Sequence, residues 1–172
     1  MKLSEWKKDL SKSNRAFLSL VWPVIQRKCG GGEIKPVEVL ADNNLALDLD
    51  RNCGIDIWQS VDGVGARGIA SRVQFTEKNW QTFTVRRSRV SGARTEYAKR
   101  LLAIESGGRF IYPYLTSQAY VDATQLVGVG VARTVDIFDA IKRGKAYINQ
   151  TDNADFFCVR WADVFECWEG LK

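Results

Sequence analysis

The residues whose types and spacing could do chemistry are concentrated in residues 54–86. This stretch carries a carboxylate, a guanidinium and a carboxamide on Asp56, Arg72 and Gln74, followed by a hydroxyl and a second guanidinium on Thr84 and Arg86. A carboxylate whose charge is perturbed by a neighbouring guanidinium is a candidate for a functional site. We therefore expect function to depend on whether the fold brings these side chains together.

Three short runs must position these side chains, namely residues 55–58, 69–75 and 82–86. Each alternates apolar and polar residues with the period of a β-strand, and glycine-rich or polar breaks separate the runs. Pairing of the three as antiparallel neighbours would give one apolar core face and one polar face. The polar face would collect Asp56, Arg72, Gln74, Thr84 and Arg86.

The rest of the chain predicts a single mixed α/β domain over residues 1–172. We expect a first helix over residues 4–28, short strands over 38–40 and 45–50, and a helix that Thr95 caps and Gly107 ends. A strand over residues 110–121 would follow that helix. This order predicts an α/β fold with a central mixed β-sheet flanked by helices.

Composition places the chain among ordinary globular proteins. Hydrophobic residues make up 45% and charged residues 26% of its 172 positions. No apolar run approaches the ~20 residues that cross a bilayer, and the first residues lack the apolar centre of a secretory signal. We therefore predict a cytoplasmic protein without a membrane partner.

The chain has no histidine and four cysteines. The absence of histidine excludes Ser-His-Asp hydrolysis, Cys-His proteolysis and metal sites built on imidazole. Cys29, Cys53, Cys158 and Cys167 form no CxxC pair, so we expect reduced, partly buried thiols rather than a zinc site.

The net charge of +5 is unevenly distributed. Residues 2–28 and 64–100 are basic, whereas residues 33–62 are acidic. An acidic cluster between two basic segments suits a polyanion bound around a divalent cation. Ordinary clustering of solvated charges is the alternative interpretation.

The segment Gly54-Ile55-Asp56, together with the order of helix, strands, helix and strand, resembles the PD-(D/E)XK superfamily of restriction-endonuclease-like phosphodiesterases. The GID triplet is similar to the one that opens the metal-binding strand in Holliday-junction resolvase-like members. The resemblance implies a restriction-endonuclease-like fold, a nucleic-acid partner, most simply DNA, and Mg²⁺-dependent hydrolysis of a phosphodiester. Asp56 would then be the first metal-binding carboxylate.

The next strand departs from the pattern of the superfamily. The resemblance implies an acid or glutamine, one spacer and then lysine, where this chain has Ala70-Ser71-Arg72-Val73-Gln74. If Arg72 replaces the lysine, Ala70 stands where the acid should be. If Gln74 is the ligand instead, Asp56 and Gln74 would hold Mg²⁺ and Arg72 would neutralise phosphate. Further metal ligands could come from acidic residues nearby in the chain, namely Glu38, Asp48, Asp50 and Glu77.

The candidate catalytic residues are therefore Asp56, Arg72 and Gln74, with Asp56 and Gln74 as metal ligands. Phosphate contacts along the following basic ridge and helix would come from Arg86, Arg87, Arg89, Arg94, Lys99 and Arg100. Two alternatives stay open. One is a catalytically inactive copy of the nuclease fold, and the other is an accessory or inhibitor module whose basic surface binds an acidic protein.

Overall fold

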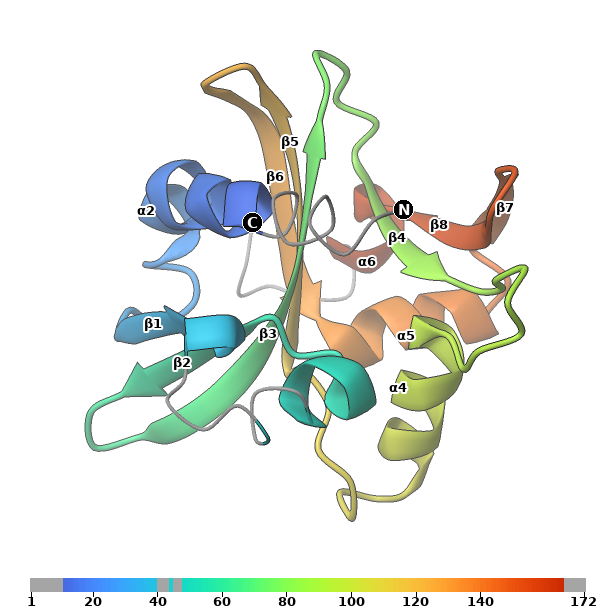
Figure 1. Cartoon of the computed structure of the whole chain (residues 1–172), viewed down its shortest axis with the longest axis horizontal. Coiled ribbons are helices and arrows are strands. Elements are labelled where there is room, and N and C mark those ends of the chain that lie inside the picture. Colours follow the sequence, from blue (N-terminus) through green and yellow to red (C-terminus); the bar gives the residue numbers. More distant parts are fainter. Residues whose placement is uncertain (1–10, 40–43, 45–47, 166–172) are drawn as a thin grey trace.

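The computed structural model describes residues 11–39, 44 and 48–165, and it contains two β-sheets with helices packed around them (Figure 1). The larger sheet has five strands in the order β1-β2-β3-β5-β6, and the smaller has three in the order β4-β8-β7. Strands of the larger sheet are β1 Glu33–Pro36, β2 Ile57–Val61, β3 Gly65–Phe75, β5 Leu115–Asp122 and β6 Gln125–Arg133. Those of the smaller are β4 Thr82–Arg86, β7 Ala146–Gln150 and β8 Asp155–Arg160.

The larger sheet is mixed. Strands β1, β2 and β3 form an antiparallel meander, and β5 lies parallel to β3. The crossover from β3 to β5 contains both β4 and helix α4, Glu96–Glu105. The predicted α/β class with a central mixed sheet flanked by helices is therefore confirmed.

Helical residues near the start of the chain cover one face of the larger sheet. They include η1 Phe17–Val21, which has π-helical hydrogen bonds, and α2 Trp22–Ile25. Pro23 is the second residue of α2 and directly follows the π-helical turn, whose last hydrogen bond runs from the Trp22 N–H to the Phe17 carbonyl. Phe17, Val21, Trp22 and Ile25 pack with Ile57, Ile69, Leu115 and Ala119 in one buried cluster.

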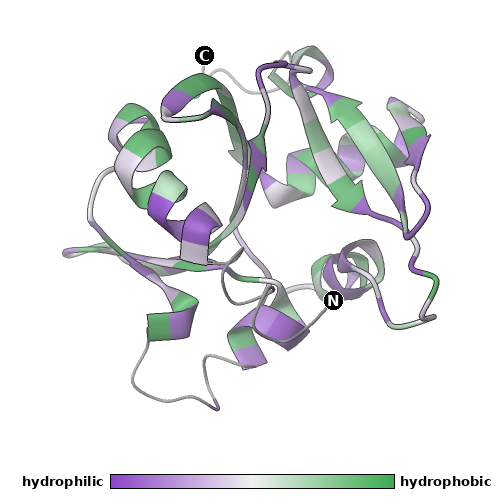
Figure 2. Ribbon diagram, turned by 45° about the horizontal axis from the view of Figure 1, so that its top comes forward, coloured by the Kyte–Doolittle hydropathy of each residue, from purple (hydrophilic) through white to green (hydrophobic). Residues whose placement is uncertain are grey.

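A second apolar cluster lies between the two sheets and the later helices, α5 Thr134–Lys142 and α6 Trp161–Phe165. Phe83 and Val85 of β4 contribute to it, as does Tyr97 of α4, whose ring stacks on Phe138 at 5.5 Å. Both sheets carry hydrophobic as well as hydrophilic residues along their ribbons (Figure 2). The second cluster fixes β4 and α4 against the larger sheet without adding β4 to it.

Several expected elements differ in the structure. Strand β4 pairs with β8, so the expectation that residues 82–86 extend the sheet of residues 55–75 was wrong. Val37–Val39 forms the 3₁₀-helix η2, where a strand over residues 38–40 was expected. Leu49–Cys53 forms the π-helical turn η3, which contains the last two residues of the strand expected over 45–50. Strand β7 was missed. Residues 4–10, 40 and 45–47 of the expected elements lie outside the described residues.

Within the described residues, no helix is both long enough and apolar enough to cross a membrane. Cys29, Cys53 and Cys158 are free thiols, as expected, and Cys167 lies outside the described residues.

Candidate functional site

A polar cavity of about 510 Å³ lies where β3, β4, β5, the turn η3 and helix α4 meet. Its basic lining residues are Arg51, Arg72, Arg86, Arg89, Lys99 and Arg100. Its acidic lining residues are Asp50, Asp56 and Glu96, and the other lining residues include Gly54, Ala70, Ser71, Thr84 and Thr116. Positive charge therefore exceeds negative charge in a cavity with polar walls.

Asp56 precedes β2 and is anchored to β3 by two hydrogen bonds. Its backbone N–H donates to the carbonyl of Ile69 at 3.1 Å, and its Oδ2 accepts from the backbone N–H of Ser71 at 2.7 Å. Burial raises the pKa of Asp56 from 3.8 to about 7, although the Ser71 N–H and the Arg100 charge oppose that rise. This carboxyl group can therefore gain or lose a proton near neutral pH.

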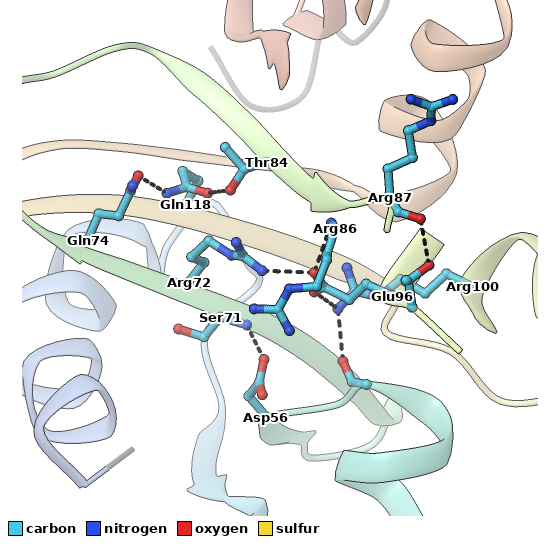
Figure 3. A network of polar contacts seen from close by, with 12 residues as sticks. Asp56, Ser71, Arg72, Gln74, Thr84, Arg86, Arg87, Glu96, Arg100 and Gln118 are labelled. Atoms are coloured by element: carbon cyan, nitrogen blue, oxygen red, sulfur yellow. Dashed lines mark hydrogen bonds and ion pairs between the residues drawn. The ribbon is translucent and has the colours of Figure 1, made fainter. Parts of the chain in front are cut away.

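Glu96 is the centre of the ion-pair network in this site (Figure 3). Its Oε2 accepts from Arg72 Nη2 at 2.8 Å and from the backbone N–H of Arg86 at 3.2 Å, and its Oε1 pairs with Arg100 Nη2 at 3.0 Å. Burial acts to raise the pKa of Glu96, but the two guanidinium groups and the Arg86 N–H outweigh it and lower the pKa to about 2. Glu96 therefore stays ionised and fixes the directions of two arginines.

Local structure at the start of α4 places Glu96 there. Thr95 is the N-cap, its hydroxyl accepting from the backbone N–H of Ala98 at 3.4 Å and donating to the carbonyl of Arg87 at 3.2 Å. The negative charge of Glu96 lies in the first helical turn, where the helix dipole favours it. Arg100 follows one turn later, at the spacing that suits an ion pair on one helix face.

The structure gives a reason for glycine at position 54, the first residue of the GID triplet. It ends η3 in the left-handed region, with φ of 69°. A Cβ at this position would lie 3.3 Å from Arg100 Nη2, and that same nitrogen donates to the Gly54 carbonyl at 3.1 Å. Glycine here permits both the turn and the close approach of Arg100.

Arg72 and Arg86 converge although they belong to different sheets. Both guanidinium carbons lie over the ring of Phe156, at 5.2 and 5.5 Å from its centroid. Burial lowers the pKa of Arg86, and the like charges of Arg72 and Arg89 lower it further. Figure 3 shows the Arg86 side chain reaching from β4 towards Arg72, Asp56 and Glu96.

Two guanidinium nitrogens in this site are buried without a hydrogen-bond partner among the described residues. These are Nε of Arg86 and Nε of Arg100. Arg100 is 2% exposed, so its nitrogen has little access to bulk water. A buried N–H without an acceptor is unfavourable, so an acceptor oxygen, from water or from a bound anion, would satisfy each of these two groups.

The structure brings together two of the three candidate catalytic residues. Asp56 and Arg72 line the cavity, whereas Gln74 lies farther along β3 and does not. Its Oε1 accepts from Gln118 Nε2 at 3.1 Å, and Gln118 Oε1 in turn accepts from Thr84 at 2.9 Å (Figure 3). In the described structure, Gln74 and Asp56 are therefore not placed to bind the same metal ion.

Of the residues predicted to contact phosphate, some line the cavity and others do not. Arg86, Arg89, Lys99 and Arg100 line the cavity. Arg87 lies over the ring of Phe157 at 5.5 Å, and Arg94 is exposed outside the cavity lining. The Lys99 ammonium donates to the carbonyl of Arg51, which connects α4 to η3.

Sequence reasoning missed the role of Glu96. Its place after the N-cap Thr95 and four residues before Arg100 predicts a helix start and an ion pair. Nothing local in the sequence predicts that α4 approaches β3 closely enough for Glu96 to reach Arg72.

The donor groups for a metal ion are few. In residues 11–39, 44 and 48–165, no group of three or more histidine, cysteine, aspartate or glutamate residues is placed to hold a metal ion. Asp50 lines the cavity, whereas the other suggested ligands, Glu38, Asp48 and Glu77, do not.

Comparison with protein-family models, with curated proteins and with solved structures gives no match to this chain.

Proposed function

We propose that this chain is a nucleic-acid-binding protein with a nuclease-like fold, and that its cavity holds a backbone phosphate, most simply of DNA. The observation that carries the proposal is a pair of buried guanidinium nitrogens, on Arg86 and Arg100, that have no hydrogen-bond partner in the described part of the chain. They lie in a cavity of surplus positive charge. A phosphate oxygen would supply the missing acceptor and reduce the repulsion among Arg72, Arg86 and Arg89.

The order of the elements supports the nuclease-like part of the proposal. Strands β1, β2 and β3 form an antiparallel meander, helix α4 follows after β4 of the smaller sheet, and β5 then lies parallel to β3. The resemblance to the PD-(D/E)XK superfamily implies this order, with the first carboxylate at the start of the second strand. Asp56 directly precedes β2 here.

The binding proposal is tested with the full chain and a labelled DNA oligonucleotide at several salt concentrations. We expect binding at about 50 mM salt that weakens steeply as salt rises, because phosphate contacts release counterions. Replacing Arg86 by glutamine should weaken binding about 10- to 100-fold, the usual worth of a charge-assisted hydrogen bond.

The matched control is Arg27→Gln, which removes the same charge at an exposed position outside the cavity lining. Equal losses in the Arg86→Gln and Arg27→Gln variants would reject the cavity as the phosphate site. If no DNA or RNA binds at low salt, an acidic protein partner becomes the better explanation of the basic surface.

Hydrolysis of a phosphodiester is a second candidate function, and the raised pKa of Asp56 favours it. A group whose pKa is about 7 can accept a proton from water at neutral pH. Incubation of supercoiled plasmid with Mg²⁺ or Mn²⁺ tests this function. Nicking that is lost in Asp56→Asn would support it, and equal nicking by both proteins would exclude Asp56 as the catalytic group.

A further inference from the structure

The carboxylates of the cavity are already engaged by the protein. Both oxygens of Glu96 pair with guanidinium groups, and Oε2 also accepts the N–H of Arg86. Asp56 Oδ2 accepts the N–H of Ser71, which leaves this carboxylate fewer lone pairs for a metal ion. A divalent cation would therefore have to displace arginines to gain Glu96 as a ligand.

The position opposite Asp56 carries no ligand. Ile57 pairs with Ile69 in the antiparallel register of β2 and β3, so the next pair outward sets Asp56 across from Ala70. Residues directly opposite on antiparallel strands project to the same face. Ala70 is buried and lines the cavity, so a methyl group lies where a second carboxylate from β3 would stand.

Charge also disfavours a cation in this cavity. Six basic side chains line it against three acidic ones. A divalent cation entering such a site meets net repulsion, whereas an anion meets net attraction. The buried Nε–H groups of Arg86 and Arg100 are hydrogen-bond donors and so match an anion.

We infer that the backbone phosphate binds in this cavity to the guanidinium groups of Arg72, Arg86 and Arg100, without a divalent metal ion. This inference rests on the proposed function and specifies how the phosphate is held. Glu96 is then a positioning residue, because it orients Arg72 and Arg100 towards the phosphate.

The test compares binding of one labelled DNA oligonucleotide to the full chain in EDTA and in Mg²⁺ at equal ionic strength. We expect the two dissociation constants to agree within about twofold, since guanidinium contacts need no metal and ionic screening is matched. Binding that is at least about tenfold tighter in Mg²⁺ would overturn the inference, because that gain would require a metal between protein and phosphate.

The same experiment separates this inference from the proposed function. DNA binding that requires Mg²⁺ contradicts the inference and leaves the nucleic-acid function in place. Absence of binding in both buffers contradicts both.

A second measurement uses a variant that adds the missing carboxylate. Ala70→Glu places a second acidic group across from Asp56, and Ala70→Gln is its uncharged control of similar size. We expect Mn²⁺ binding, measured by electron paramagnetic resonance, to be at least about tenfold tighter in Ala70→Glu than in the wild type or the control. Tight Mn²⁺ binding by the wild-type chain would contradict the inference whether or not the variant folds.

Discussion

The two faces of the central sheet at β3 and β5 differ sharply, although both are made by the same two strands. On one face, Ile69 and Leu115 pack beneath η1 and α2 in a cluster of apolar side chains. On the other, Arg72 and Thr116 line a polar cavity that β4 and α4 complete. Alternation along a strand therefore gives this protein a closed core on one side and a charged site on the other.

The difference shows how each face is stabilised. Burial of hydrocarbon holds the apolar face together and needs no particular direction. The polar face depends on directed contacts, including the two ion pairs of Glu96. We therefore expect substitutions on the apolar face to act mainly on folding, and substitutions on the polar face to act mainly on binding and on pH dependence.

The largest effect on stability is expected for Phe17→Ala on the apolar face. Phe17 is fully buried, and truncating such a side chain leaves a cavity that lowers the free energy of unfolding by about 3–5 kcal/mol. Urea denaturation measures this loss. The DNA affinity of the molecules that remain folded should be unchanged. A loss of affinity in these folded molecules would contradict the claim that the apolar face acts mainly on folding.

The next effect is expected for Glu96→Gln on the polar face. Because the folded pKa of Glu96 is about 2, below its ordinary 4.5, ionised Glu96 stabilises the fold above pH 4.5 and this stabilisation is lost as the pH falls towards 2. At pH 7 the free energy of unfolding of this variant should be about 2 kcal/mol lower than that of the wild type, which is the usual contribution of hydrogen bonds to a charged group.

Glu105→Gln is the control for Glu96, since Glu105 lies on the same helix in an exposed ion pair with Lys142. That variant should change stability by less than about 1 kcal/mol. Similar losses in the two glutamate variants would mean that the network around Glu96 stabilises no more than a surface pair.

Asp56 should show the opposite pH dependence within the same cavity. Its folded pKa of about 7 lies above the ordinary 3.8, so the folded state retains a proton that the unfolded chain releases. Stability therefore falls as the pH rises from about 4 to 7, and Asp56→Asn should remove this decline and stabilise the protein at pH 8 by about 1–2 kcal/mol. A less stable Asp56→Asn variant at pH 8 would contradict the role assigned to burial.

The smallest effect is expected for Gln74→Ala. This change removes one hydrogen bond to Gln118, worth about 1 kcal/mol, from a residue outside the cavity lining. DNA affinity should change by less than about twofold, because the phosphate contacts stay intact. A loss of DNA affinity as large as that in Arg86→Gln would show that the binding site continues along β3 to Gln74.

Much of the site could be predicted from the sequence, because alternation within a strand is a local property. Asp56 and Arg72 were expected on one polar face, and both line the cavity. Gln74 shares that face, but it lies two residues, or roughly 6.7 Å, beyond Arg72 along the strand. The alternation of residues along a strand predicts which face of the sheet a side chain lies on, but it does not predict whether that side chain reaches a site at one place along the strand.

The remaining features depend on contacts between distant segments. The apolar residues Phe83 and Val85 correctly indicated which side of β4 is buried. The strand that pairs with β4 is β8, which lies about 70 residues later in the chain. Glu96 has a local signal for a helix start, whereas its bond to Arg72 requires the docking of α4 through the second apolar cluster. Pairing and docking of this kind are set by tertiary contacts, which local patterns do not encode.

The most direct test of the central claim is nuclear magnetic resonance of the arginine Nε–H groups during titration with a DNA oligonucleotide. The Arg86→Gln variant assigns the Arg86 signal by its absence. We predict that the Nε–H resonances of Arg86 and Arg100 shift as DNA is added, because a phosphate oxygen becomes their acceptor. Shifts confined to exposed arginines such as Arg27, with Arg86 and Arg100 unchanged, would contradict the account.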